Sequence, residues 1–578
     1  MKKNNAFFWS ITIFLSIVLL LGCNAYDQTI IDTDTNEAEH HYMNKVNDSI
    51  QNNFTKKHDE GEYLRTPVLY VNTDGTGDYN CDGMNDHIEI NMALFRISRM
   101  GGGTVYLSGN NTYWIDGTLV MGANTILTGD PDACVKLVAN ADPRAIWGIG
   151  VPMICNIYGA DNLTVTGFEI NGNSEFQSVG RGLGYHNMIS FKAASNVEVS
   201  HMRLEWGNGD GLRAEDCSDV KFLYNDVYKL GHDGVYYIFT NNTETAYNSI
   251  VARTDSAARS QGGSHQTIHD NIFYSVLDKH STGPLIKLDK SEPGVQGFDH
   301  IEIYNNQLYT SNGAGIQLDA TYDDDVIRAQ NVYIHHNTFT NVGQYSIDTG
   351  YSNSAIVIGN FNNTIIENNV IDDPGQDGIR WYVQSGPTQK THFYTYVRNN
   401  VIMGSRTDAA VPHSGAGIWN TNTTYAHFIV ENNDIYDNDN GQIYPTTGPW
   451  LKMSDNLNVD PMFCNAGPDI PPGSRDYHLK SKEGRWAGAA WVYDPVSSPL
   501  IDAGSMTSPY DKEPDDNGNR INIGRYGNTE EASKSVSSAP VQDSEPISKA
   551  CPDLKNIFEN SMVTFDDSYK GCIIAGKH

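Results

Sequence analysis

Two aspartates stand in similar short motifs, Asp210 in NGDG and Asp233 in GHDG, 23 residues apart. His232 precedes the second aspartate, and Asp255 follows it after a further 22 residues. Carboxyl groups that lie close together raise one another's proton affinity, so one can stay protonated and act as an acid. Glycoside hydrolysis needs such a pair of carboxyl groups. The four residues are therefore candidates for catalysis, provided that the fold brings them together.

Two other interpretations of these residues stay open. Asp-Gly is a frequent turn sequence, and Asp377-Gly378 repeats it further along the chain, so the aspartates could serve turns alone. A lyase is the alternative chemistry, because elimination needs a base and a cation that neutralises the neighbouring uronate carboxylate. Calcium or arginine would supply the cation, and the candidate bases are His232, Tyr236, Arg259 and Lys287.

Basic and aromatic residues recur at the same place in successive repeats of the sequence, just beyond an apolar position. In chain order this row reads Arg213, Tyr236, Arg259, Lys287, Gln317, Asp348 and Arg380. The formal net charge is −31, with 39 Lys and Arg against 70 Asp and Glu, so the row is a local reversal of sign. We expect it to bind the carboxylates of an acidic sugar chain, with Tyr236 and Trp381 stacking on sugar rings. The alternative is a solvated sheet face that happens to be basic.

A sequence repeat predicts how these distant residues come together. Apolar segments end in paired asparagines, and the second residues of successive pairs lie 23 to 35 residues apart. Apolar residues alternate along these short segments, with no leucine-rich consensus and no helical half. Such a repeat indicates a solenoid, and the alternation predicts an all-β, single-stranded parallel β-helix. The aligned column reads Phe168, Met202, Asn225, Asn248, Asn271, Asn306, Asn337, Asn369, Asn400 and Asn433.

The asparagines have a structural explanation in such a fold. Asn tolerates the left-handed backbone conformation of a sharp bend between sheets. Stacked at one position in successive coils, Asn side chains can also form hydrogen bonds along the column. We therefore expect the column to be structural and not catalytic.

The same patterns divide the chain into segments. An amphipathic stretch at residues 86–103, ended by glycine, predicts a helix that caps the N-terminal end of the solenoid. The repeat fades near residue 449. We expect a signal peptide at residues 1–23, a disordered tether at 24–64, the β-helix at 65–448, its C-terminal closing segment at 449–528, and a linker with a short tail at 529–578.

The N-terminus predicts export. Lys2 and Lys3 precede an apolar run at residues 6–21, and the sequence LLGC then ends at Cys23. This pattern resembles a lipoprotein-type signal peptide, in which the cysteine is lipidated; an uncleaved membrane anchor is the alternative. In either case we expect a monomer outside the cell that touches the membrane only through this anchor. The acidic charge argues against general nucleic-acid binding.

A calcium-loop pattern precedes the predicted cap helix. Asp78, Asn80, Asp82, Gly83 and Glu89 match D-x-[DN]-x-[DN]-G-x5-E, which predicts a structural Ca²⁺ site. Position eight of the loop is polar, and no helix is expected before it, so a turn-rich entry into the cap is the alternative. No phosphate loop or dinucleotide fingerprint occurs, and no organic cofactor is expected.

Two resemblances carry the functional prediction further. The opening YVNTDGTGDYNCDGMNDHIEINMALFRISRMGGGTVYL is similar to the N-terminal segment of the pectin-lyase-like right-handed β-helix superfamily. The region from GPLIKLDK to NDNGQIYP resembles the disaggregatase-related family of methanogenic archaea, whose named member degrades a chondroitin-like matrix. The aspartates loosely resemble those of polygalacturonases, although the later Gly-His-Gly and Arg-Ile-Lys motifs of that family are not evident.

These resemblances imply a right-handed β-helix and a cell-surface enzyme. The expected substrate is an acidic, uronate-containing, chondroitin-like matrix polysaccharide, and the expected reaction is glycoside hydrolysis. A lyase on the same substrate and a non-catalytic surface protein that binds glycans are the alternatives.

Overall fold

The computed structural model describes residues 67–141, 152–178, 187–253, 255–276, 283–290, 297–320, 327, 329–344, 353–382 and 391–535. Cys23 lies outside these ranges, as do the predicted signal peptide and tether and the chain after residue 535. Within the described ranges, no helix is long and apolar enough to cross a membrane.

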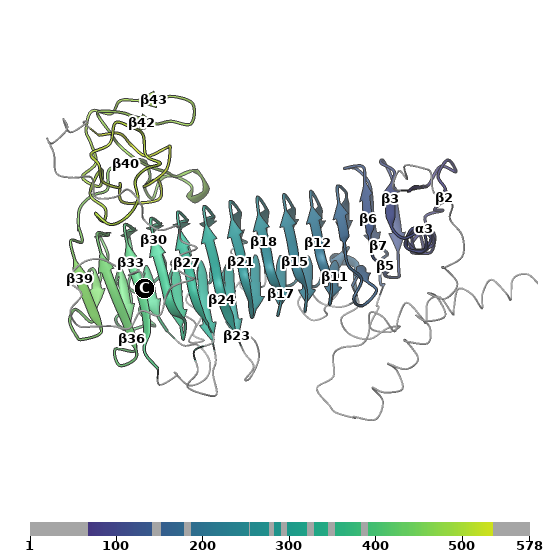
Figure 1. The fold of residues 1–578 in the computed structure, drawn as a ribbon, viewed down its shortest axis with the longest axis horizontal. Helices are drawn as coiled ribbons and strands as arrows, with labels where there is room; N and C mark the ends of the chain where they lie inside the picture. The colour runs from purple at the N-terminus through teal and green to yellow at the C-terminus, as the bar shows by residue number, and fades with distance from the viewer. Residues whose placement is uncertain are drawn as a thin grey trace, which may run out of the picture.

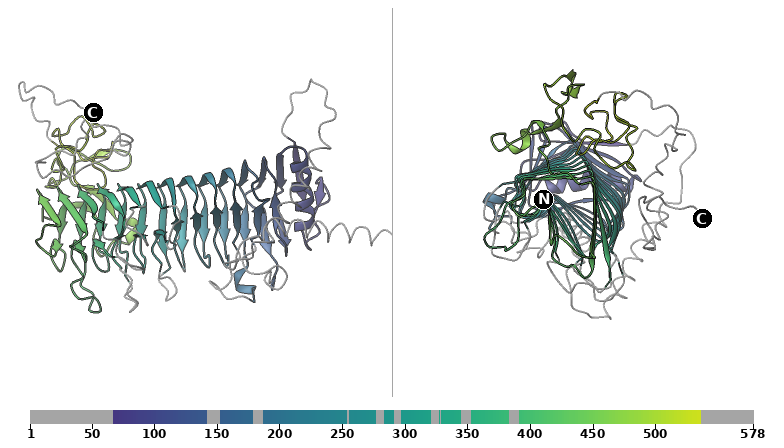
Figure 2. Two further views of the ribbon diagram at one scale, coloured as in Figure 1. Left: turned by 60° about the horizontal axis from the view of Figure 1, so that its bottom comes forward. Right: turned by 90° about the vertical axis from the view of Figure 1, so that its left-hand side faces the viewer.

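The described chain winds as a parallel β-helix with three long sheets, named A, B and C in the order in which each coil visits them (Figures 1 and 2). Sheet A has 15 strands, β2 (Tyr79–Asn80), β1 (Val68–Asn72), β3 (Gly103–Leu107), β6 (Thr125–Gly129), β9 (Leu163–Thr166), β12 (Ser195–Ser200), β15 (Ser218–Leu223), β18 (Asn241–Ala246), β21 (Gly263–His269), β24 (Phe298–Tyr304), β27 (Gln330–His335), β30 (Asn362–Glu367), β33 (Phe393–Arg398), β36 (Ala426–Glu431) and β39 (Leu451–Ser454).

Sheets B and C have 12 strands each. Sheet B contains β4 (Thr112–Ile115), β7 (Cys134–Leu137), β10 (Glu169–Asn171), β13 (Arg203–Glu205), β16 (Asp226–Tyr228), β19 (Ser249–Ala252), β22 (Ile272–Ser275), β25 (Gln307–Tyr309), β28 (Thr338–Thr340), β31 (Val370–Asp372), β34 (Val401–Met403) and β37 (Asp434–Tyr436). Sheet C contains β5 (Leu119–Met121), β8 (Ile154–Asn156), β11 (Ile189–Lys192), β14 (Leu212–Glu215), β17 (Val235–Ile238), β20 (Ala258–Gln261), β23 (Ile286–Lys290), β26 (Ile316–Ala320), β29 (Ile356–Gly359), β32 (Ile379–Trp381), β35 (Ile418–Asn420) and β38 (Ile443–Tyr444).

The hydrophobic core runs along the inside of the coils. Residues alternate between the core and the outer surface along each strand. In sheet B the central residues Ile170, Leu204 and Val227 pair in register across β10, β13 and β16, and all three are fully buried. The predicted all-β parallel β-helix is therefore confirmed, and the alternation fixes which side chains reach the outer face of each sheet.

Helix α3 (His87–Arg99) closes the N-terminal end of this core, as predicted. Its buried residues Ile90, Ala93, Leu94 and Ile97 recur at helical spacing and pack against the first coils. Figure 1 shows α3 beside β3 at the end of the stack. The short 3-10 helices are η1 (Ser174–Phe176) and η2 (Pro472–Ser474).

The paired asparagines divide two tasks between them at the corner from sheet A to sheet B. The first member takes the left-handed backbone conformation, with φ of 54° at Asn305 and 53° at Asn368. The second member forms the ladder: Oδ1 of Asn337 accepts from the backbone N–H and the side-chain amide of Asn306, each at 3.0 Å. The predicted column is confirmed, and it continues one coil further than predicted, to Asn456.

Replacing Asn337 by alanine should lower the free energy of unfolding by about 2–4 kcal/mol, because it leaves several buried polar groups without partners. Its amide also donates to the carbonyl oxygens of Ile303 (2.8 Å) and His335 (2.9 Å). The loss is measurable by urea denaturation. Asn465→Ala, at an exposed position in β40 (Phe463–Asn465), is the control and should leave stability within experimental error. If the two variants were equally stable, the asparagine ladder would not contribute to the stability of the fold.

The C-terminal segment packs against the side of the β-helix instead of across its end. Sheet A continues through β39, beyond the predicted boundary at residue 448. The following residues then cover sheet B, where the outward Val370 and Val401 are fully buried beneath Phe463 and Leu500. An ion pair of 2.6 Å between Arg475 and Asp372 fixes the contact. Figure 1 shows this segment above β30 and β33, with β40, β42 (Arg485–Trp486) and β43 (Trp491–Val492) labelled; β41 (Asp476–Leu479) pairs with β40.

The outward residues of sheet B explain why the C-terminal segment packs against the side of the β-helix. Most outward positions of a solvated sheet are polar, but β31 and β34 present valines that need cover. The apolar residues of the C-terminal segment supply it.

Candidate active site

Three consecutive turns from sheet B to sheet C bring the four predicted catalytic residues together. Asp210 lies between β13 and β14, His232 and Asp233 lie between β16 and β17, and Asp255 lies between β19 and β20. The following strands pair in register, Leu212 with Val235 and Val235 with Ala258, so the turns are stacked directly on one another.

Asp210 and Asp233 are fully buried and hold the stacked turns together. Oδ1 of Asp210 accepts the backbone N–H of Asp233 at 3.1 Å, and Oδ1 of Asp233 accepts that of Ser256 at 2.8 Å. Asn187 has the same role one coil earlier, accepting the N–H of Asp210 at 3.0 Å. The structural interpretation of the two aspartates is therefore correct in part. Their other oxygens, Oδ2, are buried and make no hydrogen bond.

His232 connects the three aspartates. Its Nδ1 lies 2.5 Å from Oδ1 of Asp210 and 3.2 Å from Oδ2 of Asp233. Its Nε2 lies 3.6 Å from Oδ2 of Asp255. The imidazole thus sits between two buried carboxylates and one that faces solvent.

The charges in this cluster shift two pKa values strongly. Burial alone would lower the pKa of His232, but the carboxylates of Asp233, Asp210 and Asp255 outweigh it and raise that pKa to about 9. Burial, reinforced by the charge of Asp255, raises the pKa of Asp233 to about 7, although His232 and Arg259 oppose the shift. The cluster therefore holds exchangeable protons across the neutral range.

Exposure separates these residues into two groups. The side chain of Asp255 is 25 % exposed and that of His232 is 16 % exposed, whereas those of Asp210 and Asp233 are 0 % exposed. Of these four residues, only Asp255 and His232 have side chains that reach the solvent and so could touch a sugar in this conformation. The burial of Asp210 and Asp233 does not favour the prediction that they act on the substrate themselves, and their side chains contact His232 instead.

The predicted basic row lies on the outer face of sheet C in the predicted order. Arg213 pairs with Tyr236, Tyr236 with Arg259, and Arg259 with Lys287, followed by Gln317. The next residue in the row is Val357, which then pairs with Arg380. The prediction of Asp348 at that place was wrong, because an insertion between sheets B and C shifts the register; Asp348 lies outside the described residues.

The row is not a free cationic surface, contrary to expectation, because carboxylates neutralise it in place. Arg259 makes a two-pronged ion pair with Asp289, at 3.1 and 2.8 Å, and its Nη1 lies 3.5 Å from Oδ2 of Asp255. Nζ of Lys287 lies 3.7 Å from Asp289. Arg213 has only looser contacts of 3.9 Å with Asp210 and Glu215.

Asp289 is not among the residues predicted from the sequence. The signal was present in the strand alternation: Lys287 points outward and Leu288 inward, so Asp289 must share the outer face with Lys287. A search for acidic residues two positions after each member of the row would have found it.

The burial of Tyr236 and Trp381 argues against the predicted stacking of these side chains on sugar rings. Tyr236 is 6 % exposed and lies between Arg213 and Arg259, whose guanidinium groups are 5.3 and 4.6 Å from the ring centre. Its hydroxyl donates to Gln261 at 2.7 Å. Trp381 is 1 % exposed and packs inside the core against Phe393. The alternation that turns Arg380 outward turns Trp381 inward.

Arg380 lies far from the cluster and belongs to another buried group. It is 7 % exposed, and its guanidinium stacks 4.0 Å from the ring centre of Trp419. Asp377, in the turn just before the strand of Arg380, accepts hydrogen bonds from the backbone N–H groups of Gly415 and Ala416, both at 3.0 Å. This Asp-Gly turn is structural, as the alternative interpretation predicted.

The predicted calcium ligands serve local backbone groups. Asp78 accepts from the N–H of Tyr70 at 2.9 Å, Asn80 from Gly77 at 2.9 Å, and Asp82 from Met84 at 3.0 Å; Glu89 lies on α3. Ca²⁺ binding by these four residues stays a prediction.

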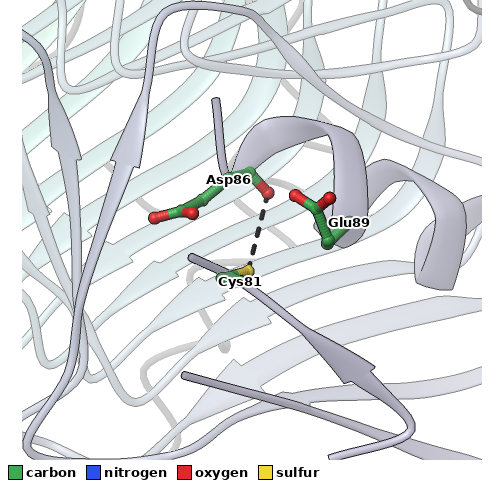
Figure 3. A group of neighbouring side chains, drawn as sticks. All are labelled: Cys81, Asp86 and Glu89. Atoms are coloured by element: carbon green, nitrogen blue, oxygen red, sulfur yellow. Dashed lines mark hydrogen bonds between the residues drawn. The ribbon is translucent and has the colours of Figure 1, made fainter. Parts of the chain in front are cut away.

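Two groups in the described ranges bring potential metal-ligating atoms within 4.8 Å of one another, Cys81 with Asp86 and Glu89, and Asp210 with His232 and Asp233. Figure 3 shows the first group at the start of α3. The carboxylate of Asp86 accepts from the N–H groups of Gly83 and Trp114, and the Cys81 thiol donates to the Asp86 carbonyl at 3.8 Å. These contacts give Asp86 and Cys81 a structural role.

Comparison with known proteins agrees with the fold. Residues 298–504 match the family model described as disaggregatase related, and residues 187–362 match that of a right-handed β-helix region. The candidate cluster at residues 210–255 lies within the second match and precedes the first. No curated protein matches the sequence.

Solved structures of similar shape include enzymes that act on glycans. The catalytic unit of a GH87 α-1,3-glucanase from Streptomyces thermodiastaticus strain HF3-3 is 14 % identical, with a TM-score of 0.50 over 70 % of each chain. An exopolygalacturonase from Thermotoga maritima is 11 % identical, with a TM-score of 0.44 over 72 % of this chain and 96 % of that one. At such identities the likeness shows the fold alone. The chain is therefore a right-handed parallel β-helix, in which residues 298–504 match the disaggregatase-related family model.

Proposed function

We propose that the protein cleaves a polysaccharide by glycoside hydrolysis, with His232 and Asp255 as the residues that touch the substrate. One observation carries this proposal: the imidazole of His232 and the carboxylate of Asp255 face solvent side by side, and two buried aspartates contact the imidazole. Hydrolysis needs a proton donor for the leaving oxygen and a base for the attacking water.

The roles follow from charge and position. His232, whose pKa is raised to about 9, is protonated at neutral pH and donates from Nε2 to the glycosidic oxygen. The Asp255 carboxylate accepts a proton from the water whose oxygen attacks the anomeric carbon as the glycosidic bond breaks. The two side chains lie 3.6 Å apart, closer than the acid and base that flank a glycosidic bond, so the sugar must separate them on binding. When the products leave, renewed contact returns the proton to His232.

An acidic matrix glycan, chondroitin-like in charge, is the proposed substrate class. Arg213 and Lys287 support it, because their side chains are 26 % and 20 % exposed and their ion pairs, at 3.9 and 3.7 Å, are loose enough to exchange for a uronate carboxylate. The match of residues 298–504 to a disaggregatase-related family supports the same class. The N-terminal sequence with Cys23 supports a location on the outer cell surface.

The pH dependence should distinguish hydrolysis from elimination. Hydrolysis requires protonated His232, so its rate should fall as the pH rises through the range around 9, where His232 loses its proton. A lyase that uses His232 as its base should instead accelerate over that range. Initial rates on a uronate-containing matrix polymer, measured across this range, give the answer.

The products provide an independent test. Hydrolysis yields reducing ends without an unsaturated sugar, whereas elimination yields an equal number of unsaturated ends with their ultraviolet absorbance. A neutral β-glucan serves as the control substrate for the proposed charge preference. Binding of the acidic polymer without any new reducing end would leave only a glycan-binding surface protein.

A further inference from the structure

Helix α3 turns one face away from the core at the N-terminal end of the stack (Figure 1). The exposed residues follow helical spacing at i, i+3, i+4, i+7 and i+8 and are named here the cap face: Met92, Phe95, Arg96, Arg99 and Met100. Met92 is 43 % exposed, Phe95 44 % and Met100 53 %. A surface helix of a globular protein normally presents polar residues on this side.

The cap face combines apolar and basic side chains in a strongly acidic protein. Arg96 and Arg99 lie in the last turn, and the Arg99 guanidinium is 5.6 Å from the ring centre of Phe95. The acidic neighbour on this helix is Glu89, in the first turn. With a formal net charge of −31, this is a local patch of opposite sign with large apolar groups in its centre.

We propose that the cap face lies on a membrane surface that contains anionic lipids. Helices with apolar residues and arginines on their outer side bind in the interfacial plane, with Phe and Met among the acyl chains and Arg at the phosphates. Charge complementarity selects this orientation, because an anionic surface repels the acidic remainder of the protein and attracts the cap face.

The position of the predicted anchor in the sequence also supports a contact between the cap face and the membrane. Residues 24–67 join the predicted anchor, with its apolar run at 6–21, to the first strand beside α3. The sheet order β5-β8-β11-β14-β17 then places the turn that carries His232 four strand spacings from β5, about 19 Å along the stack. The β-helix would stand on its cap and hold the candidate active site above the membrane. This proposal does not depend on the reaction at that site.

Site-directed fluorescence tests the contact in the full-length protein. Met92→Cys, labelled with a nitrobenzoxadiazole dye, is mixed with vesicles of phosphatidylcholine and phosphatidylglycerol, with and without bromine-labelled acyl chains. We expect the bromine to reduce emission about twofold, because the dye enters the acyl region. Met506→Cys, at an 85 % exposed position in the C-terminal segment, is the matched control and should not respond. Labelled wild-type protein corrects for the native thiols.

A second variant distinguishes the helix from the anchor. Phe95→Glu in the labelled Met92→Cys protein should abolish quenching while vesicle binding through the N-terminal segment and the melting temperature are retained. No bromine quenching at Met92 in bound protein would overturn the proposal. A change in emission that follows protein concentration and ignores bromine would also overturn it, because the cap face would then contact a second copy.

Discussion

Replacing Asp255 by asparagine should reduce kcat/KM for polymer cleavage by about 10²- to 10⁴-fold, the usual contribution of a general base. The substitution keeps the size of the side chain and removes the charge that accepts the proton from water. Because Asp255 is 25 % exposed, its loss should leave the melting temperature within a few degrees of that of the wild type. Rates of reducing-end formation at saturating and limiting substrate give kcat and KM separately.

Asp226→Asn provides the matched control for this change. Asp226 is an exposed aspartate in β16, in the coil that leads into the turn of His232, but it lies on sheet B. It should leave both kcat and KM unaltered. If Asp255→Asn cleaves as fast as Asp226→Asn, then Asp255 is not the base, and Asp289 becomes the next carboxylate to examine.

The periodic part of the fold can be predicted from the sequence with few errors. A repeat whose strands alternate apolar and polar residues leaves little choice of register, because a shift of one residue would turn the core outward. Hence the spacing predicts the correct row for Arg213, Tyr236, Arg259 and Lys287. The row fails at Asp348, where a long insertion breaks the spacing and the aligned residue is Val357.

The chemical character of the site was harder to predict, because it depends on burial and on partners. A count of basic residues in a row gives no information about Asp289, which neutralises Arg259 from the neighbouring coil. The number of residues after the asparagine ladder places Asp210 and Asp233 correctly in adjacent coils, but it does not tell how deep their carboxyl groups lie. Their complete burial, and not their spacing, is the reason that we propose His232 and Asp255 as the residues that touch the substrate.

The position of the C-terminal segment also lay beyond sequence reasoning. The repeat fades near residue 449, but the destination of the chain depends on outward-facing valines in β31 and β34, and their spacing does not indicate which residues cover them. Long-range contacts such as Arg475 with Asp372 join residues about a hundred positions apart, and no local pattern indicates them.

Replacing Asp233 by asparagine should have opposite effects on stability and activity. Asn fits the position, because Asn187 occupies the same place in the column two coils earlier and accepts the same kind of backbone hydrogen bond. The variant keeps the acceptor for the N–H of Ser256 and loses the buried charge. It should therefore fold as well as the wild type.

The gain in stability should depend on pH in a defined direction. The pKa of Asp233 is raised to about 7 in the folded protein, above its value of about 3.9 in an unfolded chain. A raised pKa means that wild-type stability is full below pH 4 and is lost as the pH rises through 7. Asp233→Asn avoids this loss, so its advantage should be absent at about pH 4 and reach a few kcal/mol at about pH 8. Urea denaturation at the two pH values measures the difference.

The same substitution should lower kcat by about 10²-fold or more, because His232 loses a carboxylate that keeps it protonated and oriented. The alkaline limb of the rate profile should then move to lower pH, which a purely structural role of Asp233 would not cause. An unchanged rate profile would show that His232 does not depend on Asp233. If the variant were less stable than the wild type at pH 8, the buried charge of Asp233 would stabilise the folded protein through its contact with Arg259. The stacked aspartates would then have a mainly structural role.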